Sequence, residues 1–256
     1  MQFIVDGSDS NTARLIVSYA QGATAGISAD LIAMRRGAAL GPGTVDLRTR
    51  AWFNEDLESR NYFVPGVMAI LVMLVTLMLT GMAIVREREV GTMEQIAVTP
   101  IRPIEFILGK CAPFAVIGFI DVMLVAALGV FWFGIPIRGS FLLLLAGAGC
   151  FLLPCLGFGL LISTISATQQ QAMMSTFFFF FPAMLLSGFV YPIANMPEVI
   201  QWLTHLDPLR HFLIIIRGVF LKGIGISILW PQFVWLVGLG VAVLAFAVAR
   251  FHRRLS

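Results

Sequence analysis

Charged side chains are scarce in this chain of 256 residues, because Asp, Glu, Lys and Arg together make up only 12% of it. Apolar residues make up 59%, and the mean hydropathy is +0.91. A water-soluble domain of this length cannot bury so large an apolar share. The composition therefore excludes an ordinary soluble protein and indicates a polytopic membrane protein.

The chain also lacks the phosphate-binding sequence Gly-x-x-x-x-Gly-Lys-Ser/Thr. That loop cradles nucleotide phosphates with backbone N–H groups, so this chain cannot bind ATP by that mechanism. Any work driven by ATP then needs a partner protein. An intramembrane enzyme would need acids, bases or a nucleophile gathered at membrane depth, and Asp121 is the one carboxylate that qualifies. The sequence therefore does not predict an enzyme.

Cysteine and histidine are rare, with three of each. Cys111, Cys150 and Cys155 lie in or at the edge of apolar segments, where thiols behave as small apolar groups. No disulfide framework follows from them. His205 and His211 have no acidic or cysteine partners at a metal-binding spacing. Neither residue type predicts a metal site.

Long apolar runs are what the chain has instead. Five of them are long enough to cross a hydrocarbon core of about 30 Å, which takes about 20 helical residues. They cover residues 64–85, 111–134, 141–165, 172–193 and 228–249. Backbone amides inside a bilayer must be satisfied within their own segment, so these runs are expected to be helices. The expected fold class is mainly α: a polytopic helical membrane protein with five transmembrane helices and a partial extracytoplasmic α/β domain.

Residues 1–62 are expected to form that partial α/β domain. Residues 3–6 predict a short strand, residues 12–36 have helical content, and the alternation over residues 45–53 predicts a second strand. One helix and two strands bury little apolar surface, so this piece is not expected to be a complete domain. Residues 63–256 form the expected transmembrane domain.

Basic residues set the expected topology. The tail carries Arg250, Arg253 and Arg254 directly after the last apolar segment, and further basic residues follow the first one. The positive-inside tendency places both regions in the cytoplasm. With five crossings, the N-terminal region then lies outside the membrane and the C-terminus lies in the cytoplasm. The net charge of +3 is too small to predict a nucleic-acid partner.

The loop on the expected outer side, residues 194–227, is more than a simple connection. Asp207-Pro208 interrupts it, and the apolar run that follows is too short to span the membrane. Two short half-helices over residues 195–223, which enter the outer face and return, fit this pattern.

A charged segment at residues 86–110 separates the first two apolar runs, and eight of its 25 residues are charged. Gly91 and Thr92 are expected to open a short amphipathic helix that stops at Thr99-Pro100. A polar surface held close to a bilayer suits the docking of a soluble partner. The alternative is a solvated loop whose charges only keep it in water.

Asp121 is placed near the midplane of its apolar segment, where a charge costs about 2.5 to 3.5 kcal/mol on insertion scales. It is therefore expected to face the interior of the helix bundle. Two roles stay open for it: a place in the substrate path or in protonation, or a plain hydrogen bond between helices.

Several motifs occur in a familiar order relative to the five apolar runs. They are Val64-Pro65-Gly66, residues 87–94, Thr99-Pro100 with Glu105 and Gly109-Lys110, and residues 208–211 with Arg217 and residues 221–223. In these motifs the chain resembles, over essentially its whole length, the membrane subunit of ABC-2 type transporters, in particular the bacterial drug-efflux-like permeases.

The resemblance implies a six-helix permease that works as a homo- or heterodimer and exports a hydrophobic or amphiphilic substrate. A separate cytoplasmic ABC ATPase would bind ATP and Mg, and this chain itself would hold no cofactor. Membrane lipid and a periplasmic adaptor are further expected partners. The first helix of the family is expected to be missing, either because the chain is a truncated or mis-started product or because a neighbouring chain supplies the rest. A passive channel or a non-transporting membrane fragment is the alternative function.

The resemblance also assigns the charged segment as the element that couples the permease to its ATPase. The residues that it assigns to this role are Glu87, Glu89, Gly91, Thr92, Met93 and Glu94. Their carboxylates are expected to pair with basic groups of the ATPase, and Met93 is expected to supply an apolar contact.

Overall fold

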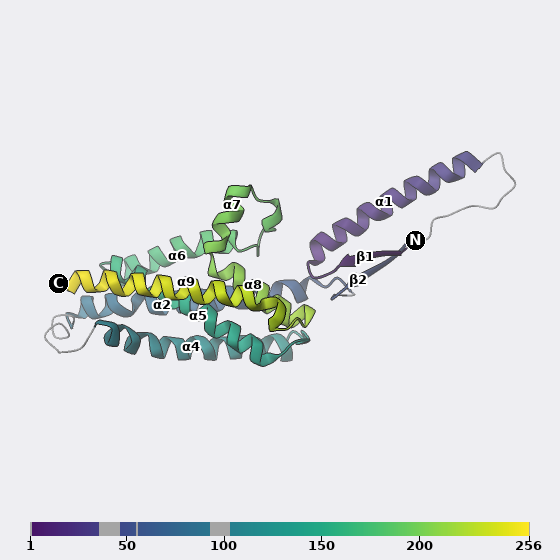
Figure 1. Cartoon of the computed structure of the whole chain (residues 1–256). Coiled ribbons are helices and arrows are strands. Elements are labelled where there is room, and N and C mark those ends of the chain that lie inside the picture. Colours follow the sequence, from purple (N-terminus) through teal and green to yellow (C-terminus); the bar gives the residue numbers. More distant parts are fainter. Residues whose placement is uncertain (1, 36–46, 55, 93–102, 256) are drawn as a thin grey trace. The chain divides into compact units, whose positions relative to one another are not determined.

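The structure is a computed structural model that describes residues 2–35, 47–54, 56–92 and 103–255. The chain divides into two compact units, Met1–Phe63 and Val64–Ser256, and each is described by itself. The second unit holds all the membrane-length helices in full or in large part (Figure 1).

The first unit is a strand–helix–strand element. Its parts are β1 (Gln2–Asp6), α1 (Ser10–Arg35) and β2 (Arg48–Trp52). The strands pair in parallel, with Gln2 opposite Arg48 and Asp6 opposite Trp52. Parallel strands need a long crossover, and α1 lies in that connection. The predicted order of one strand, one helix and one strand is confirmed.

Asp9 starts α1, because its carboxylate accepts hydrogen bonds from the N–H of Asn11 at 3.0 Å and from the hydroxyl of Thr12 at 2.6 Å. Val5 and Ala13 are buried, but few other apolar side chains of this unit are. The large exposed apolar side chains of α1 include Leu15, Ile16, Tyr19 and Ile27. The described part of the unit therefore buries little apolar surface, as expected from its sequence.

Four helices are long and apolar enough to cross a membrane among the residues that the structure describes. They are α2 (Ser59–Val90), α4 (Pro103–Phe131), α5 (Phe141–Ile165) and α9 (Ile226–Leu255). Each contains one of the predicted apolar runs in whole or in large part, and α5 coincides with the prediction. The chain is therefore a mainly helical, polytopic membrane protein.

The fifth predicted run, residues 172–193, forms the helix α6 (Gln169–Leu186), which starts earlier and ends earlier than predicted. Three glutamines occupy its first turn, and Gly188 with φ of +82° follows its end. Its 18 residues are about 27 Å long at 1.5 Å per residue. With three glutamines among its 18 residues, α6 is not one of the described helices that are long and apolar enough to cross a membrane, so the structure shows four such helices and not the predicted five.

α6 runs antiparallel to α2 along most of the length of α2. Gln169 at its start contacts Glu89 near the end of α2. In the middle, a Cβ added at Gly81 would lie 3.1 Å from the hydroxyl of Thr176. Beyond the end of α6, a Cβ added at Gly66 would lie 2.4 Å from the ring of Phe189. Both helices therefore run from one end of the bundle to the other.

α5 lies at the centre of the bundle and packs against α4, α6, α8 and α9. Its glycines allow neighbouring helices to approach closely. A Cβ added at Gly157 would lie 2.9 Å from Val243 of α9, and one added at Gly159 would lie 2.7 Å from Thr80 of α2. Any side chain at these two positions would push the helices apart.

The loop that the sequence placed on the outer side forms α7 (Glu198–Leu203) and α8 (Pro208–Arg217), separated at Asp207. Short turns, Ile193–Asn195, Thr204–Leu206 and Gly218–Lys222, flank them. The side chain of Asp207 accepts a hydrogen bond from the N–H of Leu209 at 3.0 Å and so caps α8. Two short helices with a break between them were predicted, and the structure has both.

α8 is buried against α5. The rings of Phe212 and Phe151 stack with centroids 4.3 Å apart and an interplanar angle of 7°. Further along, the N–H of Gly139 donates to the carbonyl of Val219 at 2.9 Å, close to the start of α5. The segment after α6 therefore lies along α5 and reaches the end of the bundle at which α5 begins.

Candidate functional site

α2 ends in a Schellman motif built by the first residues of the charged segment. The N–H of Gly91 donates to the carbonyl of Arg88 at 3.2 Å, and the N–H of Thr92 donates to the carbonyl of Glu87 at 3.0 Å. Gly91 has a φ of +83°, which glycine adopts without steric cost. These bonds satisfy carbonyls that would otherwise lack partners at the helix end.

Gly91 and Thr92 therefore close the end of α2. The short amphipathic helix that they were expected to open would follow Thr92, outside the described residues. Met93, Glu94 and Thr99-Pro100 lie outside the described residues. The described parts of the charged segment belong to the last turn of α2 and to the first turns of α4.

Glu87 joins the two ends of the charged segment. Its carboxylate forms an ion pair with Lys110 of α4, and both side chains are partly exposed, at 22% and 33%. The hydroxyl of Thr92 also donates to this carboxylate and, at 3.1 Å, to the Glu87 carbonyl. Glu87 was predicted to pair with basic groups of a partner. In this structure its carboxylate is occupied within the chain and ties α2 to α4.

Arg88 and Glu89 join the same end of α2 to the turn between α5 and α6. A guanidinium N–H of Arg88 donates to the carbonyl of Ser166 at 2.8 Å. The backbone N–H of Gln169 donates to the Glu89 carboxylate at 2.8 Å, and the side-chain amide of Gln169 donates to the other carboxylate oxygen. The α5–α6 turn and the end of α2 are thus held together by two neighbouring side chains.

The predicted site residues did not include the α5–α6 turn. Residues 166–171 carry no charged side chain, unlike the segment at residues 86–110. The available signal was the run of three glutamines from Gln169, which are polar residues at the membrane end of an apolar helix. Thr168 caps α6 by accepting a hydrogen bond from the N–H of Gln171 at 3.1 Å. This cap fixes Gln169 in the first turn, where it meets Glu89.

A pocket of about 480 Å³ opens beside these contacts. Its residues come from α2, from the early turns of α4 and from the start of α6: Leu79, Met82, Ala83, Arg86, Glu87, Val90, Lys110, Phe114 and Gln169. Apolar side chains therefore share this pocket with an arginine, an ion pair and an amide. Such a lining can receive an apolar side chain that carries a polar end.

Asp121 lies in α4 and is half-buried, with its Oδ2 atom fully buried. That oxygen has no hydrogen-bond partner among the residues that the structure describes, and the same holds for the hydroxyl of Thr76 on α2. Gly118, one turn before Asp121, faces Thr76, since a Cβ there would lie 3.3 Å from the threonine hydroxyl. Two polar groups without partners thus lie along the contact of α2 and α4.

A polar cluster forms where α8 meets α9. The ring of His211 lies 2.5 Å from Gln232 Oε1 through Nδ1 and 3.0 Å from the His205 carbonyl through Nε2. Burial raises the pKa of the Asp207 carboxyl to about 7, although a hydrogen bond from Leu209 opposes the shift. Burial and the charge of Arg210 lower the pKa of His205.

The described residues contain no group of three or more His, Cys, Asp or Glu side chains arranged to hold a metal ion. The free thiols Cys111 and Cys155 are buried, and Cys150 is half-buried. The polar features that remain for function are the charged segment with the α5–α6 turn, the half-buried Asp121, and the cluster at α8.

Comparisons with known proteins agree with this architecture. Residues 1–249 match the family described as ABC-2 family transporter protein. The chain is 34% identical over 261 residues to the probable multidrug ABC transporter permease YbhS of Escherichia coli K12, and the match covers all of this chain and 68% of that protein.

A second relative in Escherichia coli K12, the probable multidrug ABC transporter permease YbhR, is 32% identical over 254 residues, which cover 99% of this chain and 68% of the relative. The inner membrane transport permease YhhJ of the same strain is 31% identical over 219 residues, which cover 83% of this chain and 57% of YhhJ. The chain therefore belongs to the ABC-2 family, as the multi-pass inner-membrane permease of an ABC transporter and not its ATPase.

Proposed function

We propose that this permease exports hydrophobic or amphiphilic compounds and that the charged segment transmits the motion of the ATPase into the helix bundle. The observation that carries the proposal is the set of contacts at the end of α2. Glu87 binds α4 through Lys110, while Arg88 and Glu89 bind the α5–α6 turn. A force applied to this end therefore reaches α4, α5 and α6 together.

The substrate class is proposed from the named relatives and from the composition. Two relatives are called probable multidrug permeases, and the helices of this chain present apolar faces almost throughout. We assign Glu87, Glu89, Gly91 and Thr92 to the coupling element, together with Met93 and Glu94, which lie outside the described residues. In this role Glu87 and Glu89 act mainly by holding the element to the bundle.

α6 is proposed as the fifth membrane-crossing helix. Its contacts with α2 run from one end of the bundle to the other, and about 27 Å of helix nearly matches a hydrocarbon core of about 30 Å. With this crossing, the charged segment and the C-terminus lie in the cytoplasm, and the first unit lies outside. Residues 195–223 then enter the outer face as half-helices. Two such permeases would form the export path, and the ATPase would supply ATP and Mg.

The proposal is tested by reconstituting the permease with the ATPase encoded beside it and measuring substrate transported per ATP hydrolysed. Replacing Glu89 with alanine should lower this ratio about twofold, because it removes two solvent-exposed hydrogen bonds between the end of α2 and Gln169. Glu198→Ala, which removes a carboxylate from α7, is the control. Unchanged coupling in Glu89→Ala would reject the assignment, and transport without ATP would favour a passive channel.

Asp121 is proposed to line the export path. The support is its buried Oδ2, which finds no partner among the described residues, and the unpartnered hydroxyl of Thr76 on the facing helix. Asp121→Asn keeps the shape and removes the charge, so it should change the transport rate and the order of substrate preference. Wild-type transport of several substrates by this variant would leave Asp121 with a structural role only.

A further inference from the structure

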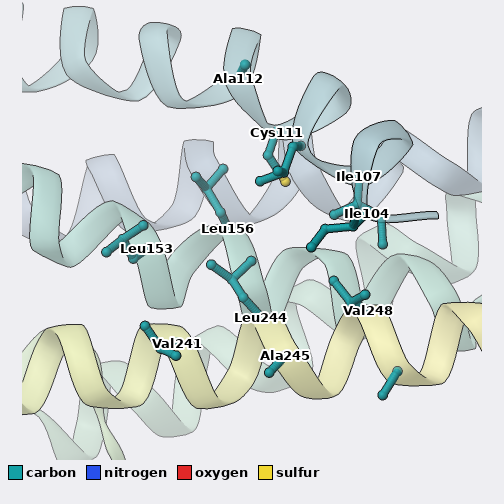
Figure 2. A pocket seen from close by; sticks show the side chains of 12 residues that line it. Ile104, Ile107, Cys111, Ala112, Leu153, Leu156, Val241, Leu244, Ala245 and Val248 are labelled. Carbon is teal, nitrogen blue, oxygen red and sulfur yellow. The ribbon is translucent and has the colours of Figure 1, made fainter. Parts of the chain in front are cut away.

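Two hollows in the bundle differ in the chemistry of their walls. The trough between α4, α5 and α9 has a volume of about 920 Å³ and is lined by aliphatic side chains and the thiol of Cys111 (Figure 2). Its walls offer a ligand little besides apolar contact. The pocket of about 480 Å³ formed by α2, α4 and the start of α6 is different, because charged side chains line it together with apolar ones. Its volume lies in the range of small-molecule sites.

The apolar and cationic parts of this pocket are separated along the helices. On α2, Leu79 and Met82 come before Arg86, at spacings that place all three on one helix face. On α4, which runs antiparallel to α2, Phe114 follows Lys110 by about one turn. The two cations therefore lie at the same end of the pocket, and the apolar side chains lie deeper in the bundle.

The lining of the pocket carries one net positive charge, since it holds the cations Arg86 and Lys110 and the carboxylate of Glu87. Glu87 is bound by Lys110 and by the hydroxyl of Thr92. Arg86 is exposed and makes no hydrogen bond or ion pair with another residue that the structure describes. Its guanidinium always carries its charge and can donate several hydrogen bonds to an anion.

The depth of the pocket fits the inner leaflet when the charged segment is cytoplasmic, as proposed above. Arg86 directly follows the apolar run at residues 64–85 and so lies at the level of the lipid headgroups. From Leu79 to Arg86, α2 rises about 10 Å at 1.5 Å per residue. Half of a hydrocarbon core is about 15 Å thick. A cation above apolar walls of this depth suits a molecule that has an anionic end and an apolar body.

We propose that this pocket binds amphiphilic anions, with the anionic group at Arg86 and the apolar part against Leu79, Met82 and Phe114. The inference rests on the proposed export function and narrows its substrates to amphiphiles that carry a negative charge. An acidic side chain of the ATPase is the competing occupant. The apolar walls below the cations favour a molecule dissolved in the membrane over a side chain of a soluble partner.

The test compares two photoreactive probes, a dodecyl sulfonate and a dodecyl trimethylammonium, which each carry a diazirine in the chain and differ in the sign of a permanent charge. The permease–ATPase complex in phosphatidylcholine nanodiscs is irradiated with each probe, and digestion with mass spectrometry locates the adducts. The sulfonate is expected to label residues 79–90 and 110–114 more strongly than the ammonium probe.

Arg86→Gln should lower the sulfonate adducts in these residues about fivefold, because a basic side chain near a membrane surface contributes about 1 kcal/mol to the binding of an anion. The ammonium adducts should not fall in this variant. Arg250→Gln, which removes an exposed arginine of α9 that does not line the pocket, is the control and should leave both probes unchanged. Met82→Trp fills the apolar part and should also lower the sulfonate adducts. ATP hydrolysis checks that each complex is intact.

Equal labelling by the two probes, or sulfonate labelling that Arg86→Gln leaves unchanged, would overturn the proposal. Loss of the ATPase from the complex in Arg86→Gln would overturn it as well, since the cation would then serve the partner protein. Export of both probes from proteoliposomes separates this site from the export function. Selective labelling without ATP-driven export would reject export and keep the site, whereas equal labelling with ATP-driven export would reject the site alone.

Discussion

Two glycines of the charged segment differ sharply in what they do. Gly91 holds a φ of +83° at the end of α2, whereas Gly109 lies inside α4 with no heavy atom within 4 Å of a Cβ built on it. An alanine at Gly91 must adopt a left-handed conformation, which costs about 1 to 2 kcal/mol. An alanine at Gly109 gains up to about 1 kcal/mol of helix propensity.

Gly91→Ala is therefore expected to loosen the end of α2, while Gly109→Ala is expected to be neutral or stabilising. Hydrogen exchange measured by mass spectrometry should be faster at the backbone amides of positions 91 and 92 in Gly91→Ala. The reason is that their hydrogen bonds to the carbonyls of Arg88 and Glu87 weaken. Transport per ATP should fall in the same variant. Equal exchange rates at these amides in Gly91→Ala and Gly109→Ala would show that the Schellman motif does not stabilise the end of α2.

At the scale of single residues, the sequence located the charged segment but could not show which of its charges are occupied. Glu87, Glu89 and Lys110 looked alike as polar groups near a membrane. Their partners lie 23 residues away for Glu87 and 80 residues away for Glu89, so only the packing of the helices brings them together. Long-range pairing of this kind leaves no periodic pattern in the sequence.

At the scale of elements, the α5–α6 turn is expected to act as a clamp on the end of α2. Gln169→Ala removes the side-chain amide that binds Glu89 and should lower transport per ATP about twofold, since a solvent-exposed polar contact contributes little. The exposed neighbour Gln170→Ala is the matched control. The measurement is the ratio of transport to ATP hydrolysis in proteoliposomes.

A double-mutant cycle separates this clamp from a general loss of stability. If Glu89 and Gln169 act through each other, the double alanine variant should lose little more coupling than either single variant. Fully additive losses, or equal losses in Gln169→Ala and Gln170→Ala, would contradict the clamp.

The membrane helices could be predicted far better than their ends. The apolar run at residues 141–165 coincides with α5, because polar residues bound it on both sides. The predicted run at residues 172–193 begins three residues after the start of α6. The glutamines at the start of α6 lower the hydropathy, although the backbone is helical from the Thr168 cap onward. Helix boundaries depend on caps such as Thr168 and Gly91, and hydropathy does not record them.

At the scale of the whole bundle, the number of crossings decides on which side each end of the chain lies. If α2, α4, α5 and α9 alone cross, the start of α2 and the end of α9 share one side of the membrane. If α6 also crosses, they lie on opposite sides. Three contacts favour the second arrangement: Gln169 with Glu89, Phe189 with Gly66, and Phe251 with Phe106. The last of these places the end of α9 beside the start of α4.

Reporter fusions test whether the start of α2 and the end of α9 lie on opposite sides of the membrane. Alkaline phosphatase, active only outside the inner membrane, is inserted at Gly22 of α1, where a Cβ would meet no atom within 4 Å, and green fluorescent protein, fluorescent only when folded inside the cell, follows Ser256. With α6 as a fifth crossing, both reporters should be active. Exchanging the two reporters should silence both, which controls for expression. If the same reporter is active at both positions, the first unit and the C-terminus lie on one side of the membrane. In that case α6 enters the membrane without crossing it.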